Sequence, residues 1–151
     1  MRVLEHRVPP PIVFLIVAAA MWLAPSMRDR TSEAPRIVAA AALCGLGLSA
    51  AVAGFLAFRR ARTTTNPVRP EAASALVTGG IYRVTRNPMY LGLTLLLLGW
   101  TVFLAAPWAL LGPVAFVFFI TRFQIMPEER VLEQKFATAY RDYRATVRRW
   151  L

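Results

Sequence analysis

The sequence contains one cysteine and one histidine in 151 residues, and this scarcity excludes several kinds of site. Cys44 lies within an apolar segment and has no second cysteine with which to form a disulfide inside the chain. Without a Cys/His cluster, zinc, haem and iron–sulfur centres lack their usual ligands. The adjacent carboxylates of Glu128 and Glu129 are oxygen ligands of the kind that hard cations take, but nothing else in the sequence implies a metal, so we predict none.

Phosphate-binding loops and acidic residues are also scarce. There is no GxxxxGK[ST] motif and no GxGxxG motif after a strand. The 8 acidic residues are outnumbered by 18 Lys and Arg, for a net charge of +10, but these cations lie between and after apolar runs, as in membrane proteins. The hydrophobic content of 57% exceeds the roughly 45–50% of soluble domains. The composition therefore predicts a membrane protein and argues against a nucleic-acid partner.

Four apolar segments predict membrane-spanning helices near residues 12–24, 37–58, 88–106 and 107–126. The first would be only about 20 Å long as a helix, so it would have to include the preceding prolines or thin the bilayer locally. Arginines precede it, as in a signal peptide, but Pro25 argues against cleavage, and we expect a retained first span. The second has small residues at helical spacing that permit close helix packing: Gly47, Ala50, Ala51 and Gly54.

The third and fourth segments meet at Ala105-Ala106-Pro107-Trp108, which has no charge and a proline able to start a helix. We expect a tight antiparallel hairpin. With four spans, 15 of the 18 Lys and Arg fall on the side shared by the N-terminus, the loop 59–87 and the C-terminus. The positive-inside rule places that side in the cytoplasm, as for a bacterial inner-membrane protein.

Two further segments complete the predicted fold. The loop 59–87 is long for so compact a chain, and we expect a short helix near 71–76 against the membrane face. After Pro127, apolar residues recur at steps of three and four, which predicts an amphipathic helix over 127–149. The fold class is therefore an all-α integral membrane protein, a single domain over 1–151, with about four transmembrane helices, a hairpin of the third and fourth spans, and a C-terminal amphipathic helix.

Two polar motifs flank the predicted hairpin, one that ends at Asn87 and one formed by Glu128 and Glu129. Each has a purely structural explanation: Asn87 as an N-cap before Pro88, the preceding arginines as interfacial anchors, and Glu128 and Glu129 as acidic residues in the first turn of a helix. A tight hairpin would nevertheless bring the two motifs together at the mouth of the bundle, where polar residues usually indicate function. The cluster suits a ligand with an amine, a carboxylate, hydroxyls and a flat ring. S-adenosylmethionine has these groups, and other nucleotides or a lipid headgroup offer some of them.

The segment 74–82, followed by Arg86-Asn87-Pro88-Met89-Tyr90 and then by Glu128-Glu129, resembles the isoprenylcysteine carboxyl methyltransferase family, particularly its small bacterial members. It is similar, more distantly, to membrane phospholipid methyltransferases. The resemblance implies S-adenosylmethionine-dependent methyl transfer to a lipophilic acceptor, with carboxyl O- or thiol S-methylation favoured over N-methylation of a phospholipid amine. It implies cofactor contacts from Ser74, Ala75, Leu76, Val77, Tyr82, Asn87, Pro88, Met89, Tyr90 and Glu128.

The remaining roles follow from the same resemblance. Arg86 and Glu129 are the expected catalytic residues, with Glu129 the nearest base for a protonated amine. Eukaryotic members carry histidine at the position of Asn87 and a substrate-binding arginine at that of Gln124, so the acceptor need not be isoprenylcysteine. Gln124 and the nearby Arg122 are the expected substrate-binding residues. An alternative of another class is a non-catalytic membrane module that uses the basic helix 130–149 for lipid binding or assembly.

Overall fold

The computed structural model describes residues 8–23, 33–61 and 75–151, and all regular secondary structure within these ranges is helical. The main helices are α1 (Pro10–Trp22), α2 (Glu33–Arg60), α3 (Pro88–Leu104), α4 (Leu111–Ile120) and α5 (Met126–Thr146). Two 3-10 helices, η4 (Gly80–Arg83) and η5 (Pro107–Leu110), and one π-helix, η6 (Thr121–Ile125), connect them. The predicted all-helical fold is confirmed.

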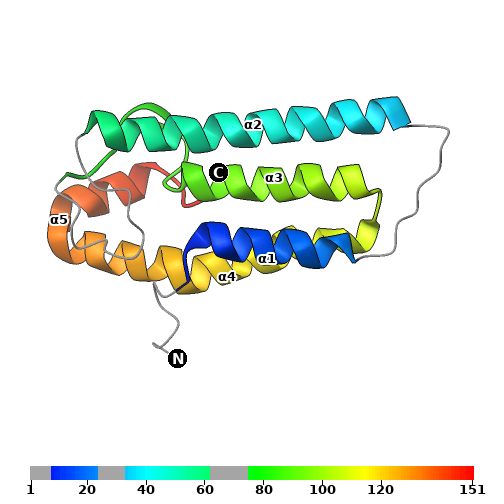
Figure 1. The fold of residues 1–151 in the computed structure, drawn as a ribbon. Helices are drawn as coiled ribbons and strands as arrows, with labels where there is room; N and C mark the ends of the chain where they lie inside the picture. Colours follow the sequence, from blue (N-terminus) through cyan, green and yellow to red (C-terminus); the bar gives the residue numbers. More distant parts are fainter. Residues whose placement is uncertain (1–7, 24–32, 62–74) are drawn as a thin grey trace.

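Helices α1 to α4 lie side by side along the long axis of the molecule (Figure 1). Helix α3 is in the middle, with α2 on one side and α1 and α4 on the other, and each of these three helices contacts it. The core between α3 and α4 contains Leu97, Phe116 and Ile120, none of which has any exposed surface. Trp100 also ties α3 to α1, because its Nε1 donates a hydrogen bond to the Ala18 carbonyl at 3.1 Å.

Two helices are long and apolar enough to cross a membrane, judged by length and composition. Helix α2 has 28 residues, which corresponds to about 42 Å. The other is the 40-residue helical stretch Pro107–Thr146, which comprises η5, α4, η6 and α5 and whose apolar part precedes Glu128. The remaining two predicted spans are present as shorter apolar helices, the 13-residue α1 and the 17-residue α3. A topology of four spans stays a prediction.

Glycines bring α2 and α3 into backbone contact. A Cβ atom added at Gly47 would lie 2.7 Å from the Gly92 carbonyl oxygen, and one added at Gly54 would lie 3.0 Å from Pro88 Cγ. The small-residue face predicted for 37–58 therefore packs against α3, as expected from close helix contact. At the other end of α3, Ala105 adopts a left-handed conformation (φ 49°) and Pro107 begins η5, which produces the predicted tight reversal into α4.

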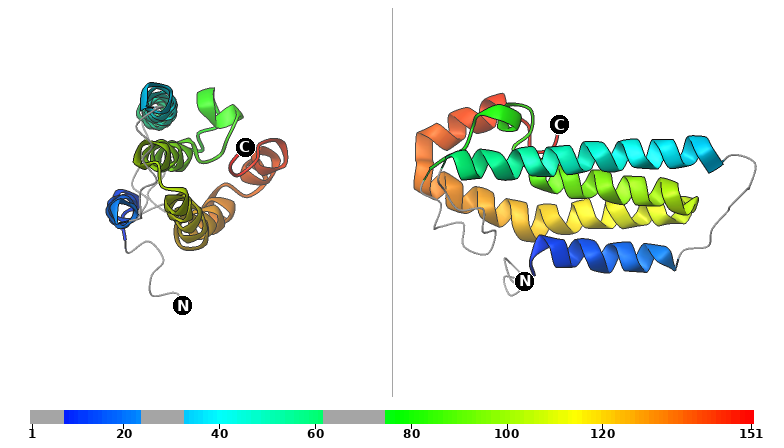
Figure 2. Two further views of the ribbon diagram at one scale, coloured as in Figure 1. Left: turned by 90° about the vertical axis from the view of Figure 1, so that its right-hand side faces the viewer. Right: turned by 45° about the horizontal axis from the view of Figure 1, so that its top comes forward.

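The chain after α4 differs from the predicted uninterrupted helix over 127–149. Ala137 has non-helical torsion angles (φ 41°, ψ −111°), and α5 turns there and runs back across the end of the bundle (Figure 2). The turn buries Tyr140, which is 2% exposed and would otherwise project away from the other helices. Helix α5 then ends at Thr146, and residues 147–151 return to the start of α3.

The loop before α3 is also more irregular than expected. Of the helix predicted near 71–76, residues 71–74 lie outside the described ranges, and residues 75 and 76 are not helical. Among the described residues from 75 onward, the first helix is η4, which begins at Gly80, where the backbone has a left-handed φ of 62°. Glycine is the residue that adopts this conformation without a steric cost.

Candidate functional site

The candidate site is built around the turn before α3, which contains Thr85 and Asn87. The expected N-cap by the Asn87 side chain is wrong, because this side chain makes no cap hydrogen bond. Its Nδ2 instead donates to the Arg149 carbonyl at 2.9 Å. Thr85 Oγ1 accepts from the Asn87 backbone N–H at 3.2 Å and donates to the same Arg149 carbonyl at 3.3 Å. Pro88 does occupy the first turn of α3, so the proline start is confirmed.

Glu129 is buried between two arginines from distant parts of the chain. Arg149 donates from Nε to Oε1 at 3.0 Å and from Nη2 to Oε2 at 2.7 Å, a bidentate pair. Arg86 Nη2 lies 3.1 Å from Oε1, and Arg86 Nη1 donates to the Tyr140 hydroxyl at 3.1 Å. The bonds to Glu129 raise the pKa of Arg149. Both oxygens of Glu129 are therefore engaged in charge-assisted hydrogen bonds, which are shorter and stronger than neutral ones.

Glu128 faces a different neighbour. The Tyr90 hydroxyl donates to Glu128 Oε1 at 2.6 Å, so the start of α3 and the start of α5 are joined. Burial raises the pKa of Glu128 to about 7, the Tyr90 hydrogen bond opposes this shift, and the charge of Glu129 adds to it. Within the described ranges no donor is placed on Oε2 of Glu128. This carboxylate thus titrates near neutral pH and retains capacity to accept a hydrogen bond.

Tyr82 lies between α2 and the second half of α5. Its ring meets that of Phe58 edge-on, with centroids 5.5 Å apart, and its carbonyl accepts a hydrogen bond from the Tyr143 hydroxyl at 2.7 Å. Burial, with smaller contributions from Tyr143 and Glu128, raises the pKa of Tyr82 far above its ordinary value. Its hydroxyl is therefore neutral at physiological pH.

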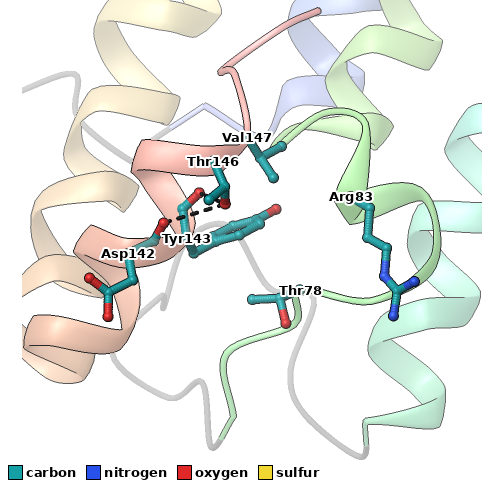
Figure 3. A pocket seen from close by; sticks show the side chains of 6 residues that line it. All are labelled: Thr78, Arg83, Asp142, Tyr143, Thr146 and Val147. Carbon is teal, nitrogen blue, oxygen red and sulfur yellow. Dashed lines mark hydrogen bonds between the residues drawn. The ribbon is translucent and has the colours of Figure 1, made fainter.

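An open depression of about 490 Å³ lies beside the segment that leads through η4. Its lining comes from the segment that leads into and through η4 and from the end of α5: Thr78, Arg83, Asp142, Tyr143, Thr146 and Val147. Figure 3 shows the Tyr143 ring in the middle, with Arg83 on the η4 side and Asp142 on the α5 side.

The structure brings together five of the predicted site residues: Arg86, Asn87, Tyr90, Glu128 and Glu129. Other predicted cofactor residues lie around them. Pro88 and Met89 contact the α2 surface at Gly54. Ala75, Leu76 and Val77 are partly buried and precede η4, whereas Ser74 lies outside the described ranges.

The two predicted substrate-binding residues lie in the π-helix η6. Gln124 is 1% exposed, and its Nε2 donates to the Val8 carbonyl before α1 at 2.7 Å. Arg122 is exposed, with its guanidinium 5.6 Å from the centroid of the Phe123 ring. The described contacts therefore do not bring either side chain to Glu128. π-Helical turns are nevertheless frequent at functional sites, so their roles stay predictions.

The sequence analysis missed four residues that build the cluster: Thr85, Tyr140, Tyr143 and Arg149. Arg149 is the last residue of the helix predicted over 127–149, and a continuous helix gives no reason to place it beside Glu129. One available signal was charge balance, since two adjacent carboxylates beside an apolar bundle favour more than one neighbouring cation. No group of three or more His, Cys, Asp or Glu side chains suited to a metal occurs in the described ranges.

These features define a class: a helical membrane protein with a buried cluster of carboxylates, arginines and tyrosines at one end of its bundle. The comparison with known families then gives the particular family. A model described as phospholipid methyltransferase matches residues 35–139, which include α2, α3, α4 and the first half of α5. The chain belongs to this family, and its enzyme class is that of the methyltransferases. The predicted resemblance to membrane methyltransferases is confirmed.

One relative extends the comparison without adding a function. The chain is similar to an uncharacterized protein of Haemophilus influenzae, with 51% identity over 63 residues. The match covers 42% of the chain and the whole of the relative.

Proposed function

We propose that the protein transfers a methyl group from S-adenosylmethionine to a lipophilic acceptor at the membrane surface. The observation that supports this most strongly is the Tyr90–Glu128 pair, which joins the starts of α3 and α5, in a protein of a methyltransferase family. A carboxylate with a perturbed pKa that retains capacity to accept a hydrogen bond is typical of a ligand site. The bilayer would deliver the acceptor directly to this end of the bundle.

The residues present fit the cofactor. Glu128 would accept hydrogen bonds from its amine or its ribose hydroxyls, and the rings of Tyr82 and Tyr90 would contact its flat base. Arg86 has a buried Nε with no acceptor among the described residues, and this donor suits a carboxylate. When bound, the cofactor supplies an electrophilic sulfonium methyl group. The protein would orient this methyl towards the acceptor and exclude water from the two partners.

The environment of Glu129 favours a carboxylate or thiolate acceptor. An anionic acceptor needs no strong base, whereas a protonated amine must first lose a proton. Both oxygens of Glu129 are bound by guanidinium groups, which makes this residue a poor base. Carboxyl O-methylation or thiol S-methylation is accordingly the favoured reaction, with Glu129 and Arg86 organising the site.

N-methylation of a phospholipid amine is the second candidate, and the description of the matched family favours it. In that reaction Glu128 is the better base, because its pKa of about 7 is close to physiological pH. The orientation expected from the positive charges places the site on the cytoplasmic face of a bacterial inner membrane. Both candidates share this orientation.

Calorimetric titration of the detergent-solubilised protein with S-adenosylhomocysteine tests the cofactor assignment. The wild type is expected to bind, and Glu128→Gln to bind more weakly. Glu133→Gln is the matched control, since it removes a carboxylate from the same helix that pairs with the exposed Arg144 at 3.5 Å. A wild type that does not bind would refute the proposal and leave the non-catalytic lipid-binding alternative.

Transfer of a radiolabelled methyl group into extracted lipids separates the two acceptor classes. Label released by mild base indicates a methyl ester, and label retained in a phospholipid headgroup indicates an N-methylated amine. A thioether is also stable to base, so base-stable label outside the phospholipid headgroups would indicate S-methylation.

A further inference from the structure

Residues 147–151 form a return segment that is fixed to the bundle at several points. Val147 is buried, and Trp150 Nε1 donates to Thr121 Oγ1 in η6 at 3.3 Å. The Arg148 carbonyl accepts a hydrogen bond from the Arg86 backbone N–H at 3.0 Å. The Arg149 carbonyl accepts from both Asn87 and Thr85. A segment far away in the sequence therefore supplies the hydrogen-bond acceptors for the turn that starts α3.

The Arg149 side chain fixes this segment in place. Its guanidinium forms the bidentate pair with Glu129, on the first turn of α5, and shares Glu129 Oε1 with Arg86. The side chain of Glu129 is 12% exposed and that of Arg149 33%, so the pair is partly shielded from water. A planar guanidinium fork determines orientation as well as distance, which an ammonium group does not do. Arg149 thus connects α5, the return segment and the turn before α3 through one side chain.

We propose that Arg149 is a positioning residue for the cofactor site, an inference that rests on the proposed function. Its pair with Glu129 holds the return segment against residues 85–87, and that turn directs α3 so that Tyr90 meets Glu128. Arg149 itself need not touch the cofactor. Without the guanidinium, Arg86 and Glu129 still pair, but Val147, Trp150 and the backbone bonds alone hold the return segment, so its carbonyl groups are held less firmly against Asn87 and Thr85. The cofactor residues on the first turn of α3 then lose their fixed orientation.

Calorimetric titration with S-adenosylhomocysteine tests this role in three variants of the full-length protein. Arg149→Gln is expected to raise the Kd at least tenfold, and Arg149→Lys to give an intermediate value because it keeps the charge without the bidentate geometry. Arg148→Gln is the matched control. It removes the same charge from the neighbouring residue, whose side chain is exposed and whose backbone carbonyl is kept. Its Kd should equal that of the wild type.

A role limited to stability gives a different result. It would lower the binding stoichiometry, which reports the folded fraction, and leave the Kd of the folded protein unchanged. An unchanged Kd in Arg149→Gln, or an equal increase in Arg148→Gln, would overturn the proposal. Should Arg149→Gln fail to fold, Arg149→Lys decides: a raised Kd supports positioning and a wild-type Kd overturns it.

A second measurement does not depend on the cofactor. Amide hydrogen exchange at residues 85–87 should become faster in Arg149→Gln than in Arg148→Gln, because the turn loses its fixed acceptors. Equal exchange in the two variants contradicts the positioning role even if the wild type binds no cofactor. In contrast, faster exchange together with a wild type that does not bind S-adenosylhomocysteine would refute the proposed function alone.

Discussion

The backbone contact between α2 and α3 predicts that Gly92 does not tolerate even one added methyl group. A Cβ atom built at Gly92 lies 2.5 Å from the Gly47 carbonyl oxygen and 2.8 Å from Ala51 Cβ. Neither atom is the end of a flexible side chain, so the helices must separate. Overpacking of this kind costs about 1–3 kcal/mol, and the rigid neighbours place Gly92→Ala near the upper end. The higher helix propensity of alanine offsets about 0.5–1 kcal/mol of this.

The net expected loss is about 2 kcal/mol, which lowers the midpoint of thermal unfolding by about 4–8 °C for a protein of this size. Unfolding is followed by circular dichroism in detergent. Gly45→Ala is the matched control, because it makes the same change in α2 at a position with nothing within 4 Å. It should be neutral or slightly stabilising. A Gly92→Ala protein as stable as Gly45→Ala would refute the close approach of the two helices.

Three further predictions concern the site and the turn in α5. The folded-state pKa of Glu128 lies above its unfolded value, so the ligand-free fold loses stability as the pH rises through about 7. Glu128→Gln should abolish this pH dependence in thermal unfolding measured from pH 5.5 to 8.5. A pH profile unchanged by the substitution would contradict the raised pKa of Glu128. Tyr90→Phe removes a 2.6 Å bond to a carboxylate and should cost about 1.5–3 kcal/mol of stability or cofactor affinity, whereas a neutral effect in both assays would exclude the bond. Ala137→Gly should stabilise the protein by about 1 kcal/mol, because it relieves a strained backbone. The same change at the helical Ala139 should destabilise the protein, and chemical denaturation measures both effects. Equal effects of the two substitutions would argue against the turn at Ala137.

The bundle itself was accessible from the sequence because its determinants are local. Apolar runs, the glycine face of 37–58 and the proline after Ala106 each specify a helix, a contact or a reversal within a few residues. The meeting of Arg86 with Glu129 followed from the hairpin alone, since antiparallel neighbours bring their outer ends together. These parts needed no information about distant contacts.

The turn in α5 and the role of Arg149 were not accessible in this way. Alanine is the best helix former, so nothing at Ala137 signals a break, and the apolar period continues through Trp150. The break depends on tertiary contacts, in which Tyr140 and Tyr143 bond to Arg86 and to the Tyr82 carbonyl. Asn87 was misread for the same reason, since the acceptor that replaces its cap is supplied by the return segment.

The division of roles between the two adjacent glutamates follows from helix geometry. Successive residues in an α-helix point about 100° apart, so Glu128 and Glu129, on the first turn of α5, cannot face the same neighbour. Glu129 faces the two arginines and is saturated by them, whereas Glu128 faces Tyr90 and keeps capacity to accept a hydrogen bond. The charge of Glu129 raises the pKa of Glu128, and the hydrogen bond from Tyr90 opposes this shift. The paired glutamates therefore divide into a structural anchor, Glu129, and a neighbour, Glu128, whose carboxylate is proposed to bind the ligand.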